Sequence, residues 1–275
     1  MRRDELLIST DRLAGLLDDP GVRVVDVRWS LADAATGERE YESGHIPGAL
    51  YLHWYRDLSD PDESILGQLA PPDRFRESME RAGIGDETRV VAYDDGVIFM
   101  AARLAWCLHS YGHANVRILD GGLPKWVREG RPVEAGRAEA PGRAMFTPRP
   151  NPLIRATKED VLGILERGDA ALLDCRMDET WDAVGAHIPG ARRLPAPSLV
   201  SAGDGTLLPA EELERRAEAA GATPDDPLVL YCGGGVSASL AFGALRTLGY
   251  RNLRVYDGSW SEWDADPETP KEPHV

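Results

Sequence analysis

An internal repeat limits the possible folds of this chain more than any other feature of its sequence. Four segments of the first half recur in the same order in the second half. The pairs are "VRVVDVRW" (22–29) with "AALLDCRM" (170–177), "SGHIPGA" (43–49) with "GAHIPGA" (185–191), "VVAYDDG" (90–96) with "LVLYCGG" (228–234), and "VRILDGGLPKW" (116–126) with "LRVYDGSWSEW" (253–263). The separation between equivalent positions falls from 148 residues, for Asp26 and Asp174, to 137, for Asp120 and Asp257. This steady decrease indicates one duplicated domain whose second copy has shorter loops.

Each copy alternates short β-rich runs with segments of helical periodicity. In the second copy, the strands "AALLDC", "LVLYC" and "LRVYD" alternate with helices expected over 157–168, 208–221 and 236–250. Such alternation is typical of an α/β fold in which helices flank a mainly parallel sheet. We therefore expect two tandem α/β domains, 1–135 and 153–275, joined by a linker over 136–152 that is rich in Pro, Gly and Arg.

The charge balance argues against some classes of partner. Among 275 residues, 31 Lys and Arg face 46 Asp and Glu, which gives a formal net charge of −15. Nucleic acids and anionic membranes attract basic surfaces, so neither is expected as a partner. The start "MRRDELLIST" lacks the apolar core of a signal peptide, and no run approaches the roughly 20 apolar residues of a membrane span. A cytoplasmic location is expected.

The three cysteines, Cys107, Cys175 and Cys232, form an odd set with no C-x-x-C pair. Neither a disulfide framework nor a zinc site is therefore expected, and no metal or organic cofactor is predicted. Cys107 and Cys175 lie within apolar helix and strand patterns, which favours a place in the core.

Cys232 differs because it closes an apolar strand and three glycines follow it, with a helix expected about four residues later. In a sheet of this type, ligands bind beyond the carboxyl ends of the strands. Loop amides and the start of a helix both favour an anionic sulfur, and glycine lets the backbone curl tightly around it. The sequence thus predicts a thiolate site at Cys232, with the loop amides as the binding groups: Gly233, Gly234, Gly235, Val236 and Ser237.

The twin copies, the two "HIPGA" segments, the loop "CGGGVSA" and the terminal "YDGSWSEW" together resemble the tandem-domain rhodanese sulfurtransferases. The resemblance covers nearly the whole chain, and it implies two similar domains of which only the C-terminal one is catalytic. It also implies that Cys232 takes sulfane sulfur from a small donor, forms a persulfide and passes the sulfur to cyanide or a thiol. The first copy has Asp94 at this position, and a carboxylate cannot form a persulfide.

The resemblance leaves the donor open between 3-mercaptopyruvate and thiosulfate. Members that act on thiosulfate typically carry basic residues after the cysteine, whereas those that act on 3-mercaptopyruvate usually read Cys-Gly-Ser/Thr-Gly-Val-Thr. Gly233 and Gly234 add no charge, which favours the mercaptopyruvate type. The loop departs from that pattern because Gly234 replaces the hydroxyl residue and Ser237 replaces the threonine.

The groups that would bind the donor are less clearly marked. The family's substrate-binding arginines precede the second "HIPGA", where this chain has none between Arg176 and His187. Arg192, followed by Arg193 directly after the motif, is the candidate replacement. His45, in the first "HIPGA", is expected either to hold its turn through hydrogen bonds or to assist proton transfer.

Two further features have structural interpretations. Asp26 and Arg28, repeated as Asp174 and Arg176, are predicted to form ion pairs at strand ends. The two tryptophans of the terminal "GSWSEW" are predicted to pack at the interface between the domains rather than to bind substrate.

Two other functions compete with sulfur transfer. Cysteine phosphatases and arsenate reductases of related fold need a Cys-x5-Arg loop, and Ala238 occupies the arginine position here. The second alternative is a persulfide carrier or binding module that serves a protein partner without turnover. A carrier would use the same Cys232, so only turnover with a small acceptor separates the two.

Overall fold

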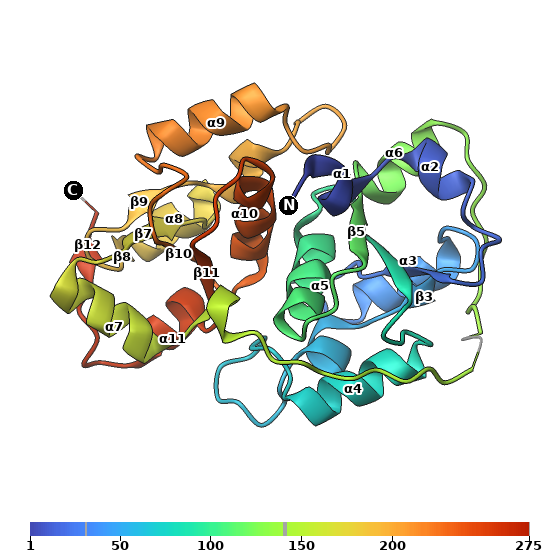
Figure 1. Ribbon diagram of the computed structural model, residues 1–275, viewed down its shortest axis with the longest axis horizontal. Coiled ribbons are helices and arrows are strands. Elements are labelled where there is room, and N and C mark those ends of the chain that lie inside the picture. Colours follow the sequence, from blue (N-terminus) through green and yellow to red (C-terminus); the bar gives the residue numbers. More distant parts are fainter. Residues whose placement is uncertain (31, 140–141, 275) are drawn as a thin grey trace.

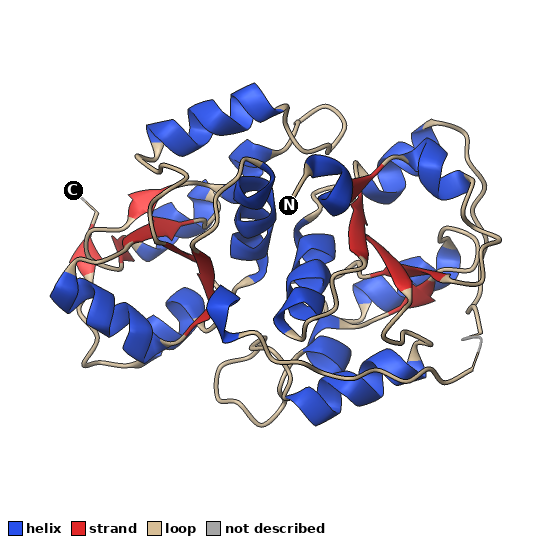
Figure 2. Ribbon diagram, in the orientation of Figure 1, coloured by secondary structure: helices blue, strands red, loops and turns tan. Residues whose placement is uncertain are grey.

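Two five-stranded sheets organise the chain, one in each half, and every strand pair within them is parallel. The strand order is β1-β5-β4-β2-β3 in the first sheet and β6-β11-β10-β7-β9 in the second. The computed structural model describes residues 1–30, 32–139 and 142–274. Its two halves lie side by side, each with helices on both faces of its sheet (Figures 1 and 2). The predicted fold class, two tandem α/β domains with mainly parallel sheets, is confirmed.

The elements of the first half have the following bounds. They are α1 (Arg3–Leu6), β1 (Leu7–Ile8), α2 (Thr10–Ala14), β2 (Val22–Asp26), α3 (Thr36–Ser43), β3 (Leu50–Tyr51), the π-helix η1 (Trp54–Leu58), α4 (Pro72–Arg81), β4 (Arg89–Tyr93), α5 (Phe99–Ser110), β5 (Val116–Leu119) and α6 (Gly122–Arg128).

The second half repeats this order and adds a small antiparallel pair, β8 with β12. Its elements are the 3-10 helix η2 (Pro152–Ile154), β6 (Arg155–Ala156), α7 (Lys158–Arg167), β7 (Ala171–Asp174), α8 (Asp178–Val184), β8 (Ala186–His187), β9 (Arg192–Arg193), the 3-10 helix η3 (Ala196–Leu199), α9 (Ala210–Ala219), β10 (Leu228–Tyr231), α10 (Val236–Thr247), β11 (Leu253–Tyr256), α11 (Ser259–Ala265) and β12 (Glu272–Pro273).

Helices predicted from the sequence of the second copy are present, within one to three residues of the expected ends. At α7, the Thr157 hydroxyl accepts a hydrogen bond from the amide of Asp160, and the Asp160 carboxylate accepts one from the amide of Thr157. This reciprocal capping satisfies two amides that the first helical turn leaves without partners.

One apolar core runs through both halves because α5 packs along α10. Both helices are apolar on nearly every face, since each has its own sheet on one side and the other helix on the opposite side. A large apolar contact of this kind fixes the two domains relative to each other.

The segment predicted as a linker lies against the first half over much of its described length. Phe146 is buried in the shared core, and the amides of Arg149 and Asn151 donate hydrogen bonds to the carbonyls of Tyr111 and Ser110. The domain limits at 135 and 153 remain a prediction.

The predicted ion pairs are confirmed in both copies. Arg28 and Asp26 approach to 2.7 Å, and Arg176 and Asp174 to 2.6 Å, all with buried side chains. Each arginine also donates a hydrogen bond to the carbonyl of the residue directly before the "HIPGA" histidine, and so ties the strand end to that turn. The pairs are structural.

The prediction for the two tryptophans of the last motif is wrong. Trp260 and Trp263 pack in a core cluster made only of second-half residues, beneath the sheet and against α7. The indole of Trp263 donates a hydrogen bond to the carbonyl of Pro270, as Trp126 does to Pro132 in the first copy. Both indoles secure the segment after their own helix.

In the part of the chain that the structure describes, no helix combines the length and the apolar character needed to cross a membrane.

Candidate active site

The loop after β10 lies where the order of the strands reverses. After β7 the chain adds β9 on one side of that strand and β10 on the other. In open parallel sheets, the crevice at such a reversal, beyond the carboxyl ends of the strands, is the usual place for a ligand. Cys232 directly follows β10, and α10 begins at Val236, so the thiol lies at this point of the sheet.

Residues 259–261 of the terminal "YDGSWSEW" motif hydrogen-bond to the backbone of the Cys232 loop. The amide of Cys232 donates to Oγ of Ser259 (3.1 Å), and its carbonyl accepts from the amide of Trp260 (2.9 Å). The carbonyl of Gly233 accepts from both the amide (3.0 Å) and the hydroxyl (2.7 Å) of Ser261. The loop backbone is therefore fixed on one side, and Cys232 itself is only 2 % exposed.

Only one of the three loop glycines is required by the backbone. Gly235, immediately before α10, has a φ of 77°, a region that favours glycine. A Cβ on Gly235 would lie 2.9 Å from Nη1 of Arg103 and 2.9 Å from the carbonyl oxygen of Asp257. A Cβ on Gly233 would meet nothing within 4 Å, and one on Gly234 would be in ordinary contact with Trp54. The absence of side chains at Gly233 and Gly234 leaves free space beside the loop.

The first copy shows what such a loop binds. The buried carboxylate of Asp94 accepts four backbone hydrogen bonds from its own loop and helix start. Oδ1 accepts from Gly96 (3.0 Å) and Ile98 (2.9 Å), and Oδ2 accepts from Met100 (3.0 Å) and Ala101 (3.2 Å). The four amides form an anion-binding site, which the carboxylate of Asp94 occupies.

The second copy has a similar loop, with the smaller side chain of Cys232 in place of Asp94. Residues 94–98 separate β4 from α5, whereas 232–235 separate β10 from α10, one residue fewer. Apart from bonds within α10, the amides of residues 233–237 donate to no acceptor in the described ranges. These amides are thus free to serve an anion at Cys232, such as a thiolate or a sulfur bonded to it.

The first domain also contributes an aromatic wall, which the sequence did not reveal. Trp29, Trp54 and Tyr55 pack together, with ring centroids 4.7 to 5.4 Å apart. A Cβ placed on Gly234 would lie 3.9 Å from Cη2 of Trp54, so this cluster borders the Cys232 loop from the other domain. No pattern along the chain signals a contact between segments so far apart.

The two remaining candidate residues, His45 and Arg192, lie in other environments. His45 is 1 % exposed, with Nδ1 2.8 Å from the carbonyl of Tyr41 and Nε2 3.3 Å from Glu134. These contacts explain a role in holding the turn, and a part in proton transfer stays a prediction. The exposed Arg192 donates to the carbonyl of Gly221 at the end of α9, and Arg193 donates to the carbonyl of Arg176. A role for Arg192 in donor binding also stays a prediction.

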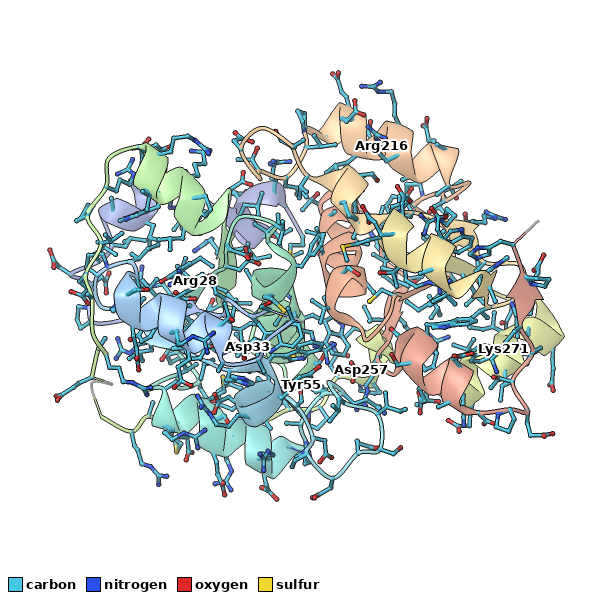
Figure 3. All side chains as sticks on the ribbon, turned by 180° about the vertical axis from the view of Figure 1, so that it is seen from behind. Arg28, Asp33, Tyr55, Arg216, Asp257 and Lys271 are labelled. Atoms are coloured by element: carbon cyan, nitrogen blue, oxygen red, sulfur yellow. The ribbon has the colours of Figure 1, made fainter. Side chains whose placement is uncertain are left out.

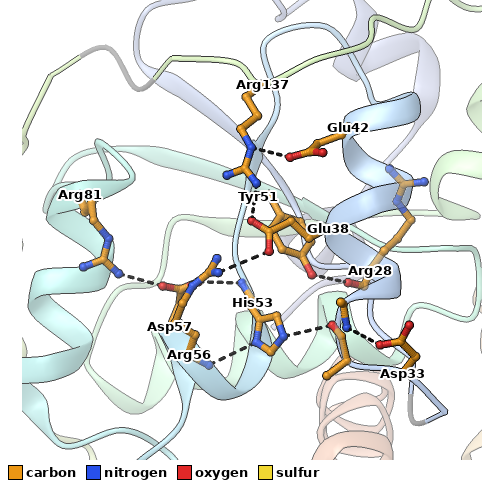
Figure 4. A network of polar contacts seen from close by, with 12 residues as sticks. Arg28, Asp33, Glu38, Glu42, Tyr51, His53, Arg56, Asp57, Arg81 and Arg137 are labelled. Atoms are coloured by element: carbon orange, nitrogen blue, oxygen red, sulfur yellow. Dashed lines mark hydrogen bonds and ion pairs between the residues drawn. The ribbon is translucent and has the colours of Figure 1, made fainter.

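A cavity of about 510 Å³ in the first half is lined by several arginines and carboxylates. Three of its arginines have carboxylate partners: Arg81 and Arg56 contact the buried Asp57 at 2.8 and 3.2 Å, and Arg137 contacts Glu38 at 2.8 Å (Figure 4). The carboxylates that line the cavity are therefore used largely within it.

The other two thiols differ from Cys232 in their surroundings. Both are fully buried; burial raises the pKa of Cys107 to about 11 and that of Cys175 well above its ordinary value. Since the thiolate is the nucleophile, we expect iodoacetamide at pH 8 to modify Cys232 alone in the native protein. Peptide mapping by mass spectrometry, with a denatured sample in which all three react as the control, checks this. Native labelling of Cys107 or Cys175 as fast as Cys232 would contradict it.

Ser259 combines backbone strain with a hydrogen bond to Cys232. Its φ of 52° is unusual for a residue with a side chain, and the equivalent residue of the first copy is Gly122. We expect Ser259→Ala to lower the free energy of unfolding by about 2 kcal/mol, because the buried amide of Cys232 loses its acceptor while the strain remains. Ser259→Gly should cost about 1 kcal/mol less, since glycine relieves the strain. Urea unfolding measures both, and equal losses would refute the assignment of strain.

This geometry defines a class of two-domain α/β protein that has a cysteine in the loop between a central strand and the following helix. The rhodanese-like domain model matches residues 9–129 and 157–266, so the chain belongs to the rhodanese family. Relatives of similar length include a 3-mercaptopyruvate sulfurtransferase of Escherichia coli (34 % identical, 97 % of both chains covered) and a putative thiosulfate sulfurtransferase, SseB, of Mycobacterium tuberculosis (36 %, 98 % and 97 % covered). Another is the sulfur carrier protein TtuD of Thermus thermophilus (35 %, 94 % and 93 % covered).

The fold agrees with a solved structure of the same family. The crystal structure of SseA from Escherichia coli, described as a 3-mercaptopyruvate sulfotransferase, has a TM-score of 0.86 and 32 % identity, with 92 % of this chain and 98 % of that chain covered. The resemblance to the tandem-domain rhodanese sulfurtransferases is therefore confirmed.

Proposed function

We propose that this protein is a sulfurtransferase that moves sulfane sulfur from a small donor to a thiophilic acceptor through a persulfide on Cys232. The twin loops are the observation that carries the proposal. The first one holds the carboxylate of Asp94 with four amides, and the second has Cys232 at the same point of its sheet, in a loop whose amides at 233–237 have no other acceptor in the described ranges outside α10. Relatives named as sulfurtransferases support the same function.

The proposed chemistry needs only the thiolate and the loop. The sulfur of Cys232 attacks the donor's sulfur, and the bond from that sulfur to the rest of the donor breaks. From 3-mercaptopyruvate, pyruvate leaves as its enolate with the bonding electron pair and takes up the proton of the donor thiol; from thiosulfate, sulfite leaves with the bonding electron pair. Cyanide or a thiolate then attacks the outer sulfur of the persulfide, and the S–S bond breaks to restore the Cys232 thiolate. The amides of 233–237 stabilise the negative sulfur in both states.

Within this proposal we favour 3-mercaptopyruvate as the donor. Gly233 and Gly234 bring no positive charge to the loop, and both arginines after the second "HIPGA" contact backbone carbonyls. With so little positive charge at the loop, a dianion such as thiosulfate would gain less electrostatic binding energy than a donor with one carboxylate. We also propose that the protein acts in the cytoplasm, without nucleic acid, membrane, metal or organic cofactor.

A persulfide carrier for a protein partner is the second candidate, because a relative is named a sulfur carrier protein. Turnover separates the two functions. With excess donor and excess cyanide or dithiothreitol, an enzyme forms many equivalents of product per chain, whereas a carrier stops near one. Measuring the ratio of kcat/KM for the two donors in the same assay establishes which one is preferred. Product that never exceeds one equivalent would reject the enzyme.

A further inference from the structure

Asp257 is a buried carboxylate shared between the two domains. It follows β11, its side chain is 1 % exposed, and Figure 3 shows it where the two halves meet. Its Oδ2 accepts a hydrogen bond from the amide of Leu69 in the first half (2.8 Å) and lies 3.3 Å from Nη2 of Arg155. Its Oδ1 lies 2.7 Å from Nη1 of Arg103, which belongs to α5 of the first half.

The first copy repeats most of this arrangement. Asp120, which follows β5, accepts a hydrogen bond from the amide of Leu207 in the second half (2.8 Å) and lies 3.7 Å from Arg3. Leu69 and Leu207 are equivalent positions of the repeat, as are Asp120 and Asp257. Each domain therefore binds a loop of the other domain through an aspartate. Asp257 lies near the Cys232 loop, and Asp120 lies near the equivalent Asp94 loop.

The two copies differ at Arg103. It is the fifth residue of α5, and the fifth residue of α10 is the buried Leu240. Among the described residues, a fully buried guanidinium from the opposite domain is thus present only at the aspartate beside Cys232, whereas Asp120 has only Arg3 of its own half nearby. Burying an arginine costs folding free energy unless a carboxylate pairs with it. Because only one of the two copies has this buried arginine, a role specific to the Cys232 site is expected.

Arg103 is held firmly and touches the catalytic loop. Its side chain is 0 % exposed, its Nη2 donates to the carbonyl of Gly67 (2.8 Å), and its guanidinium lies 4.6 Å from the ring centroid of Trp106. A Cβ on Gly235 would lie 2.9 Å from Nη1, so the guanidinium is packed against the residue that immediately precedes α10. Burial opposes the charge, but Asp257, together with Cys107 and Cys232, outweighs burial, and the pKa of Arg103 is raised. The side chain is a cation.

We propose that Arg103 is a positioning residue of the active site, through which the first domain holds the Gly235 end of the loop so that its amides point at the sulfur of Cys232. This inference rests on the proposed function only in taking Cys232 as the reactive thiol. The other charged and titratable groups at this place are Asp257 after β11, Arg155 on β6, Cys107 on α5, Tyr111 after α5 and Cys175 after β7. Both of those thiols are neutral at ordinary pH, so no second anion masks the effect.

The test is the pH dependence of Cys232 alkylation, followed peptide by peptide, which needs no sulfur donor. We compare the wild-type protein with Arg103→Met and with Arg103→Met/Asp257→Asn, which leaves no unpaired carboxylate buried. Arg155→Met is the matched control, because it removes a half-exposed arginine from the same carboxylate and keeps the contact between Arg103 and Gly235. Circular dichroism and thermal unfolding establish that each variant is folded.

In both Arg103 variants we expect the alkylation midpoint to rise by about one pH unit, with roughly tenfold slower alkylation below it. Arg155→Met should keep the wild-type midpoint. A wild-type midpoint in a folded Arg103→Met protein would overturn the proposal. A rise that disappears in the double variant would also overturn it, because the unpaired Asp257 would then be the cause. If the wild-type protein takes no sulfur from any donor while the midpoints shift as expected, the proposed function fails and the role of Arg103 stands.

Discussion

Replacing the thiol in Cys232→Ser is expected to lower kcat/KM for sulfur transfer by about a thousandfold or more, to the background of the assay. A serine hydroxyl at this position is protonated at neutral pH and cannot hold a sulfane sulfur, so both halves of the cycle are lost. The fold should be unaffected, because the loop is held by backbone groups and by Ser259 and Ser261. Steady-state assays with each donor and cyanide measure the effect.

The matched controls are Cys107→Ser and Cys175→Ser. Both residues are fully buried in the shared apolar core, so each hydroxyl costs some stability. Their kcat/KM should nevertheless stay within about threefold of the wild type, since neither thiol takes part in the proposed reaction. Transfer that survives in Cys232→Ser, or that is lost in a folded Cys107→Ser or Cys175→Ser, would contradict the assignment of the nucleophile.

Gly235→Ala is expected to destabilise the protein by about 3 kcal/mol and to slow sulfur loading strongly. The methyl group would occupy a backbone with φ of 77° and lie 2.9 Å from the carbonyl oxygen of Asp257, which cannot move without shifting β11. It would also displace Arg103 from its place beside the loop. Urea unfolding and the rate of sulfur uptake from the donor measure the two effects.

The neighbouring glycines provide the control for this prediction. Gly233→Ala has free space and Gly234→Ala meets only Trp54 at 3.9 Å, so both should keep the wild-type stability within about 0.5 kcal/mol. Equal destabilisation at all three positions would mean that the whole loop, and not Gly235 alone, depends on glycine.

Much of the fold could be predicted from the sequence because the repeat doubles each local signal. Strands such as "LVLYC" and helices such as "TKEDVLGILERG" carry their own periodicity and caps, and a second copy in the same order confirms each one. The position of Cys232 follows from the same logic, since a thiol between a buried strand and a glycine-rich helix start must lie at the carboxyl edge of the sheet.

The contacts between the domains could not be predicted in this way. Arg103 lies within an apolar helix, and nothing near it in sequence shows that Asp257, 154 positions later, is its partner. The aromatic wall of Trp54 is hidden for the same reason. The tryptophans of the last motif were misplaced because apolar character predicts burial but not the core in which a side chain is buried. Such pairings depend on how two copies of one fold pack together.

The most direct test of the central claim is the mass of the intact protein after incubation with 3-mercaptopyruvate or thiosulfate and no acceptor, followed by peptide mapping. The wild-type protein should gain one sulfur atom on the peptide that contains Cys232, more quickly with 3-mercaptopyruvate, and lose it when cyanide is added. Cys232→Ser should gain none. An unchanged mass of the wild-type protein with both donors, or an added sulfur on Cys107 or Cys175, would contradict the proposed mechanism.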